Sequence, residues 1–145
     1  MSKLKNLIAG LAGAVALNIL HETLKNKDSN MPRVDLLGED ALQKTLKYFG
    51  GKIDHKDDLY KATLAGDIIG NTLYYSLIGA DKSAYIWPKA VFFGLTAGIG
   101  AVTLPKPMGL DETPVAKNDE VKVLTVAYYL FGALVTGAVL NMLKK

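Results

Sequence analysis

The sequence predicts an all-α fold, an integral membrane bundle of four transmembrane helices with a short amphipathic helix in the first loop. Three observations support this prediction. Of the 145 residues, 50% are hydrophobic and only 21% are charged. The charges are unevenly distributed, because about half of the 17 basic and 14 acidic residues lie in residues 25–61. Small residues also recur at four-residue spacing, which lets membrane helices pack closely.

Four segments are long enough to cross a bilayer, which requires about 20 largely apolar residues. They cover residues 4–24, 59–79, 85–104 and 121–143. Neither the last segment nor most of the third has the charged face of a soluble amphipathic helix. A chain of this length cannot surround two such helices with a soluble core. We therefore expect residues 1–145 to form a single membrane domain.

The second segment is the least apolar of the four, because Asp67 and Asn71 interrupt it. It ends only a few residues before the third segment, which predicts a tight helical hairpin. Each segment also contains two small residues four positions apart, a spacing typical of close helix contacts in membranes. The pairs are Ala9 and Gly13, Gly66 and Gly70, Gly94 and Gly98, and Ala133 and Gly137.

Residues 25–58 form a polar loop that contains a short helix. Pro32 marks a turn, Asp35 is placed to cap the helix, and Gly50 and Gly51 mark its end. Leu37, Ala41, Leu42, Leu46 and Phe49 share one side of it. This amphipathic pattern suits a helix in the lipid headgroup region. A cap packed over the end of the bundle is the alternative.

We expect a multi-pass protein of the bacterial inner (plasma) membrane. More basic residues lie in the two long loops, which favours those loops in the cytoplasm. The basic residues immediately beside helix ends, such as Lys3, Lys5 and Lys144, favour cytoplasmic termini instead. We predict cytoplasmic termini, and dual topology is the alternative.

Several polar residues are expected at similar depth in the membrane. At about 1.5 Å per residue, Asp67 and Asn18 each lie about 9 Å inside the same face. The predicted polar cluster consists of Asn18, His21, Glu22, Asp67 and Asn71, and hydroxyls of Thr125, Tyr128 and Tyr129 approach from the same side. An ionisable residue in the membrane indicates a functional site by default. A hydrogen bond that only holds two helices together is the alternative for Asp67.

Two basic residues are candidates for lipid headgroup or ion-pair contacts. Arg33 follows Pro32 and is placed to fold back onto Glu22 or onto a lipid phosphate, which its planar guanidinium binds well. Lys89 enters from the opposite face and is offset in depth from Asp67. It is expected to extend its ammonium group to its own interface.

The sequence lacks the common motifs of enzymes and metal sites. There is no cysteine, and no GxSxG elbow, HExxH helix or phosphate-binding glycine loop. The basic residues are not interleaved with aromatic residues as in nucleic-acid-binding proteins. We expect no enzymatic activity, no cofactor, no metal site and no nucleic-acid partner.

Two sequence runs resemble small bacterial inner-membrane proteins of uncharacterised function. They are Asn18-Ile19-Leu20-His21-Glu22 and Met31-Pro32-Arg33-Val34-Asp35-Leu36-Leu37-Gly38. The resemblance covers about a third of the chain. It implies a four-span membrane protein and provides no catalytic residues.

The sequence favours a structural, lipid-binding or accessory membrane component, with membrane lipids as partners and a homo-oligomer as a further option. The alternative is a small ion, proton or solute transporter or channel that uses the Asp67 and His21 polar groups. A passive component predicts that these polar groups are all bonded internally. A transporter predicts a cavity that reaches Asp67.

Overall fold

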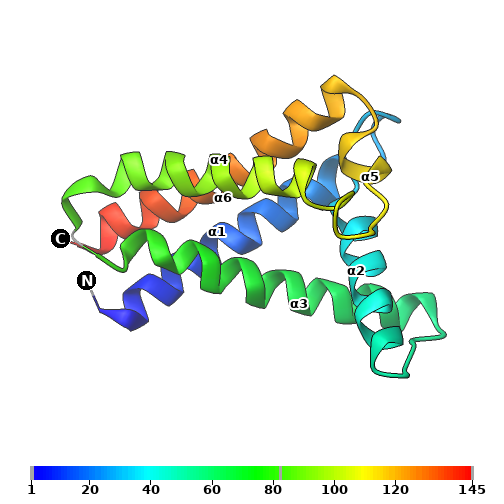
Figure 1. Ribbon diagram of the computed structural model, residues 1–145. Coiled ribbons are helices and arrows are strands. Elements are labelled where there is room, and N and C mark those ends of the chain that lie inside the picture. The colour runs from blue at the N-terminus through cyan, green and yellow to red at the C-terminus, as the bar shows by residue number, and fades with distance from the viewer. Residues whose placement is uncertain (1, 82, 145) are drawn as a thin grey trace.

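The computed structural model describes residues 2–81 and 83–144, and these residues form helices and loops without a strand (Figure 1). The all-α prediction is confirmed. The six α-helices are α1 (Lys3–Leu24), α2 (Val34–Tyr48), α3 (Lys56–Ser76), α4 (Ile86–Thr103), α5 (Thr113–Ala116) and α6 (Asp119–Leu143). Two short 3₁₀ turns, Leu77–Gly79 and Ser83–Tyr85, connect α3 to α4.

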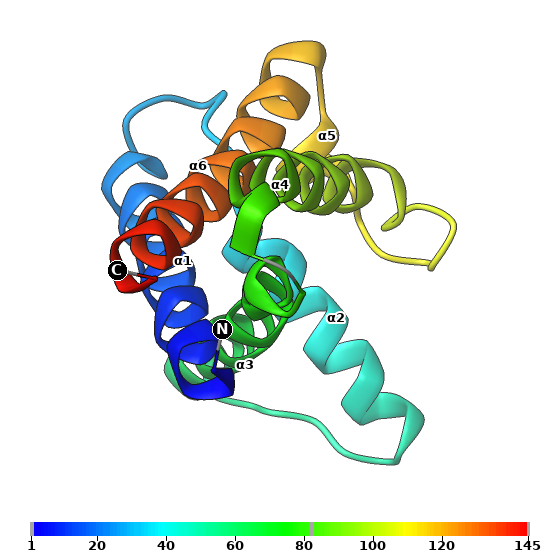
Figure 2. The same ribbon diagram turned by 90° about the vertical axis from the view of Figure 1, so that its left-hand side faces the viewer.

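The four long helices form an open bundle (Figure 2). In that bundle α3 packs against α1, α1 against α6, and α6 against α4. By contrast, α3 and α4 make few contacts with each other. The bundle is therefore incomplete on the side between α3 and α4.

Three of the long helices, α1, α4 and α6, are long and apolar enough to cross a membrane. Charged residues at the start of α3, together with Asp67, leave that helix less apolar. All four helices nevertheless present large apolar side chains outward, including Ile8, Ile69, Phe92 and Val123. Such an extensive exposed apolar surface is unusual for a soluble monomer and is compatible with a membrane protein.

Three of the four small-residue pairs lie in tight contacts between helices. A Cβ atom added at Gly98 would lie 2.6 Å from the Cα of Val126 on α6, so the two helices approach at backbone distance. The pair Gly66 and Gly70 on α3 differs, because a Cβ there would meet no atom within 4 Å. The close contact of α3 with α1 is instead made at Gly10 of α1, where an added Cβ would lie 2.9 Å from the backbone nitrogen of Ser76.

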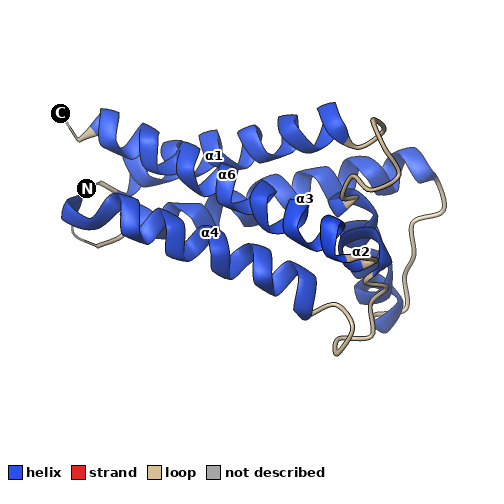
Figure 3. Ribbon diagram, turned by 90° about the horizontal axis from the view of Figure 1, so that it is seen from above, coloured by secondary structure: helices blue, strands red, loops and turns tan. Residues whose placement is uncertain are grey.

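The two ends of the bundle differ (Figure 3). One end carries α2, α5 and the long loops. The other end carries the turns between α3 and α4 and both ends of the described chain, where the Lys5 ammonium donates a hydrogen bond to the carbonyl of Leu143 at 3.0 Å. The polar residues predicted to meet lie near the end that α2 covers.

Candidate functional site

The start of α2 packs over the ends of α1 and α3. The backbone N–H of Arg33 donates to the carbonyl of Pro114 at 2.9 Å, which links α2 to α5. One turn later Gly38 lies so close to α3 that an added Cβ would be 2.7 Å from Thr63 Cγ2. The last residues of the helix extend beyond the bundle, where Tyr48 and Phe49 are exposed. The first half of α2 is thus a cap on the bundle end.

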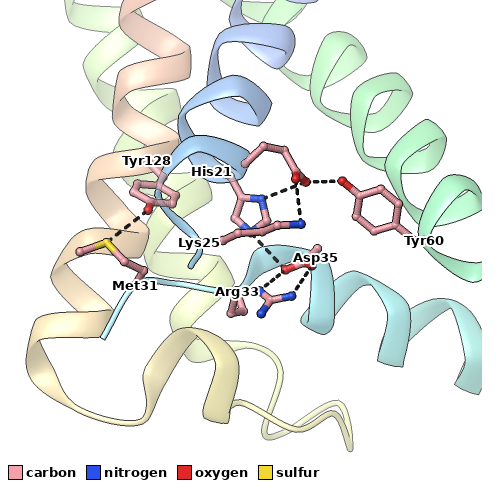
Figure 4. A network of polar contacts seen from close by, with 8 residues as sticks. His21, Lys25, Met31, Arg33, Asp35, Tyr60 and Tyr128 are labelled. Atoms are coloured by element: carbon pink, nitrogen blue, oxygen red, sulfur yellow. Dashed lines mark hydrogen bonds and ion pairs between the residues drawn. The ribbon is translucent and has the colours of Figure 1, made fainter. Parts of the chain in front are cut away.

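His21, Asp35 and Arg33 form a charged network where α2 meets α1 (Figure 4). The Arg33 guanidinium donates two hydrogen bonds to Asp35, from Nε to Oδ1 at 2.9 Å and from Nη2 to Oδ2 at 2.8 Å. The buried His21 ring places Nε2 3.1 Å from Oδ1 of the same carboxylate. Nε2 is not aligned for a hydrogen bond with this oxygen, and the contact is an ion pair when the imidazole is protonated. One carboxylate therefore joins α1 to the chain that leads into α2.

Two expectations about this loop are corrected by the network. The guanidinium of Arg33 binds both carboxylate oxygens of Asp35, two residues later in the chain, and does not bind Glu22. Asp35 lies inside the first turn of α2 and makes no capping hydrogen bond, because His21 and Arg33 engage its carboxylate. Burial alone raises the pKa of Asp35, but the neighbouring His21 and Arg33 side chains outweigh this effect and hold the pKa well below its usual range.

Glu22 forms a second network on the outer side of His21. Its carboxylate accepts a hydrogen bond from the Tyr60 hydroxyl of α3 and lies 2.8 Å from the Lys25 ammonium. The same ammonium lies 5.0 Å from the centre of the Tyr60 ring, close enough for a cation–π interaction. His21 Nδ1 is 3.6 Å from Glu22 Oε1, so the two networks share the imidazole. Together they connect α1, α2 and α3.

The five residues of the predicted polar cluster line one small cavity between α1, α2 and α3. We call this the polar cavity; its lining includes Asn18, His21, Glu22, Asp67 and Asn71. Its volume is about 20 Å³, which is enough for one water-sized group. Asp35 and Thr63 also line it, and the Thr63 hydroxyl is buried without a hydrogen-bond partner among the described residues. The polar residues share a site, although His21 contacts Asp35 and not Asp67.

Asp67 is the least satisfied acidic group of this site. Within residues 2–81 and 83–144, no hydrogen bond or ion pair is formed by its partly buried carboxylate. Asp67 and Asn71 border the polar cavity on one side and a second, larger space on the other. Because burying a charged group without a partner is costly, this unpaired carboxylate is the most informative feature of the site.

The larger space is a lateral groove of about 550 Å³ between α3 and α4. Its walls are mainly apolar and include Leu37, Ala41, Ala97, Gly100 and Met108. Its volume falls in the usual range of small-molecule sites. Among the described residues that line the groove, Asp67 is the single acidic residue, and none is a lysine, arginine or histidine. The lateral groove thus combines apolar walls with one acidic group.

Tyr74 holds α3 and α4 together at this site. Its hydroxyl donates a hydrogen bond to the Phe93 carbonyl of α4 at 2.7 Å, and the two rings pack edge to face. Tyr74 also lines the lateral groove. The groove therefore lies between this contact and the part of α2 that covers the bundle end.

The hydroxyls expected from α6 differ in position. Thr125 donates within α6 and to the carbonyl of Val115, so it does not join the polar cluster. Tyr128 packs edge to face with His21, and its hydroxyl faces the Met31 sulfur. Tyr129 lines the lateral groove with Asp67. Lys89 lies in the first turn of α4, far along the bundle from the Asp67 end.

The sequence patterns predicted Asp35 as a helix cap but indicated neither its contacts with His21 and Arg33 nor the lateral groove. Asp35 shares a helix face with Gly38 three residues later, and this small residue could have indicated that the face packs closely on another helix. On α4, a run of small residues could have indicated the groove, because small side chains leave it open. These residues are Thr96, Ala97, Gly100 and Ala101. No group of three potential metal ligands occurs among the residues that the structure describes. Comparison of the chain with protein-family models, curated proteins and solved structures finds no match.

Proposed function

We propose that this protein is a lipid-binding component of the bacterial inner membrane, with four transmembrane helices and cytoplasmic termini. It takes an amphiphilic molecule from the bilayer into the lateral groove between α3 and α4. The observation that carries the proposal is the open groove of about 550 Å³ with the unpaired Asp67 carboxylate in its wall. No catalytic step is part of the proposal.

The position of α3 supports a fourth membrane crossing. α3 packs along α1, which is itself apolar enough to cross. The charges at the start of α3 lie at the end that α2 covers, and its outward residues from Ala62 to Leu77 include no charged side chain. Asp67 faces inward to the polar cavity and groove. The charges that make α3 less apolar are thus away from the surface that lipid would contact.

The composition of the groove supports an amphiphile as ligand. Binding sites for small molecules are mostly apolar with a few polar groups that fix the orientation. Here the apolar walls suit a hydrocarbon chain, and Asp67 and Asn71 provide a polar end. The groove lies between two helices that face the bilayer, so a molecule can enter it sideways from the membrane.

Photo-cross-linking tests this proposal. The full chain in phosphatidylcholine nanodiscs is irradiated with a diazirine derivative of dodecanol, a neutral amphiphile, and the labelled residues are mapped by mass spectrometry. We expect labels on the groove walls of α2, α3 and α4. Uniform labelling of all outward helix faces would contradict the proposal.

Gly100→Phe provides a variant that fills the groove. A Cβ at Gly100 would meet only Leu104 Cδ1, at an ordinary contact distance of 3.5 Å, so the new ring extends into the groove without displacing backbone. Ile99→Phe is the matched control, because Ile99 is exposed and does not line the groove. We expect groove labelling to be lost in Gly100→Phe and kept in Ile99→Phe.

A second candidate function is proton or solute transport. It is favoured by the fact that Asp67 and Asn71 border both the polar cavity and the lateral groove. A proton taken up by Asp67 could then pass toward His21 and the polar end of the bundle. Liposomes with the wild-type chain or Asp67→Asn test this idea, and equal proton flux in the two preparations would exclude it.

A further inference from the structure

We infer that the lateral groove selects amphiphiles with a primary ammonium head over anionic and neutral ones, with Asp67 as the group that binds the ammonium. This inference rests on the proposed lipid-binding function and names the chemical class of the ligand. It is carried by the charge of the groove and by the hydrogen-bonding state of Asp67.

The Asp67 carboxylate needs donors that the described part of the protein does not provide. Its oxygens lie beside Gly38, where an added Cβ would be 3.3 Å and 3.4 Å away, so the backbone of α2 covers them from one side. No described side chain donates a hydrogen bond to them. A carboxylate has only acceptors, so a ligand that complements it must bring the donors. An ammonium group brings three.

The surroundings of Asp67 disfavour an anionic head. The described residues that line the groove include no lysine, arginine or histidine. His21, whose charge acts on Asp67, lines the polar cavity and not the groove, and its ring contacts the carboxylates of Glu22 and Asp35. A phosphate or carboxylate placed beside Asp67 would therefore meet a like charge without a compensating cation.

The other polar groups of the groove also suit an ammonium. Asn71 offers an amide oxygen next to Asp67, and the rings of Tyr74 and Tyr129 line the same space. Aromatic faces attract cations, and the attraction is stronger in surroundings from which water is excluded. The chain of the ligand would then lie against the small residues Ala97 and Gly100 of α4.

Competition with the neutral diazirine probe tests the selectivity. Dodecylamine, dodecanol and dodecanoate have equal chain length and differ in head charge. In phosphatidylcholine nanodiscs at mildly alkaline pH, we expect dodecylamine to displace the probe at about tenfold lower concentration than the other two, as for loss of one charged hydrogen bond. Equal competition by dodecanoate or dodecanol would overturn the inference.

Asp67→Asn separates head selectivity from binding itself. This variant keeps the shape of the side chain and removes its charge, so we expect the probe still to label the groove while the preference for dodecylamine disappears. Asp111→Asn is the control for charge alone, because Asp111 is exposed and outside the groove; it should keep the preference. A dodecylamine preference that survives in Asp67→Asn would also overturn the inference. Absence of groove labelling in the wild-type chain would contradict the proposed function as well.

Discussion

His21 of α1 and Asp35 of α2 meet with 3.1 Å between Nε2 and Oδ1, and both side chains are buried. The same carboxylate accepts two hydrogen bonds from Arg33. Asp35 is thus the point at which α1 and the chain entering α2 are attached to each other. Its loss would leave Arg33 without its carboxylate partner and His21 with Glu22 alone.

Asp35→Ala should lower the free energy of unfolding by about 2 kcal/mol, because a charged hydrogen-bond network loses its central acceptor. Thermal unfolding of the detergent-solubilised protein measures the effect. Asp54→Ala is the control, because the carboxylate of Asp54 is highly exposed and pairs with the equally exposed Lys52, and exposed ion pairs contribute little to stability. Equal thermal stability of the two variants would show that the network does not hold α2 in place.

Asp35 should also make stability depend on pH. Its pKa is lower in the folded protein than in the unfolded chain, because His21 and Arg33 outweigh the effect of burial. Such a group stabilises the fold above its ordinary pKa of about 4, and this contribution is lost as the pH falls below that value. We expect the melting temperature of the wild-type chain to fall more between about pH 7 and about pH 3 than that of Asp35→Asn. Parallel pH curves would contradict this assignment.

Substitution of glycine by alanine should have opposite effects on stability at Gly98 and at Gly66. Gly98→Ala places a Cβ 2.6 Å from Val126 Cα and should destabilise the fold by about 1–3 kcal/mol through overpacking. Gly66→Ala meets no atom within 4 Å and should be neutral or stabilising by up to about 1 kcal/mol, because alanine favours helix. Unfolding of both variants in detergent provides the comparison. A stable Gly98→Ala would mean that α4 and α6 are farther apart than described.

Tyr74→Phe should weaken the link between α3 and α4. The substitution removes the hydrogen bond to the Phe93 carbonyl and should cost about 1 kcal/mol. Hydrogen exchange of the α3 and α4 amides should increase near this contact. Tyr48→Phe is the control, because Tyr48 is exposed at the end of α2. An equal increase in exchange of the α3 and α4 amides in Tyr48→Phe would argue against a specific role for Tyr74.

The positions of the long helices were readily predicted because hydropathy is a local property of the sequence. The predicted segments 4–24, 85–104 and 121–143 coincide closely with α1, α4 and α6. The segment 59–79 begins later than α3, because Lys56, Asp57 and Asp58 belong to the helix without adding to its apolar character. The all-α fold thus follows from apolar run length alone, whereas the membrane crossing of α3 stays a prediction.

The candidate site could be predicted only in part. Asn18 and Asp67, which were expected at equal depth along two helices, both line the polar cavity. Depth says nothing about rotation, so it could not show that His21 turns toward Asp35. The lateral groove was not predicted for a related reason. It exists because α3 and α4 make few contacts apart from the one between Tyr74 and Phe93. Sequence patterns indicate which helices form more clearly than which helices pack together.

The hydrogen bond between Lys5 and Leu143 has a practical consequence. α1 begins beside the residue at which α6 ends. A split fluorescent reporter with one half fused before α1 and the other half after α6 should therefore reassemble within a single molecule. The reassembled fluorophore would report folding of the whole bundle in living cells.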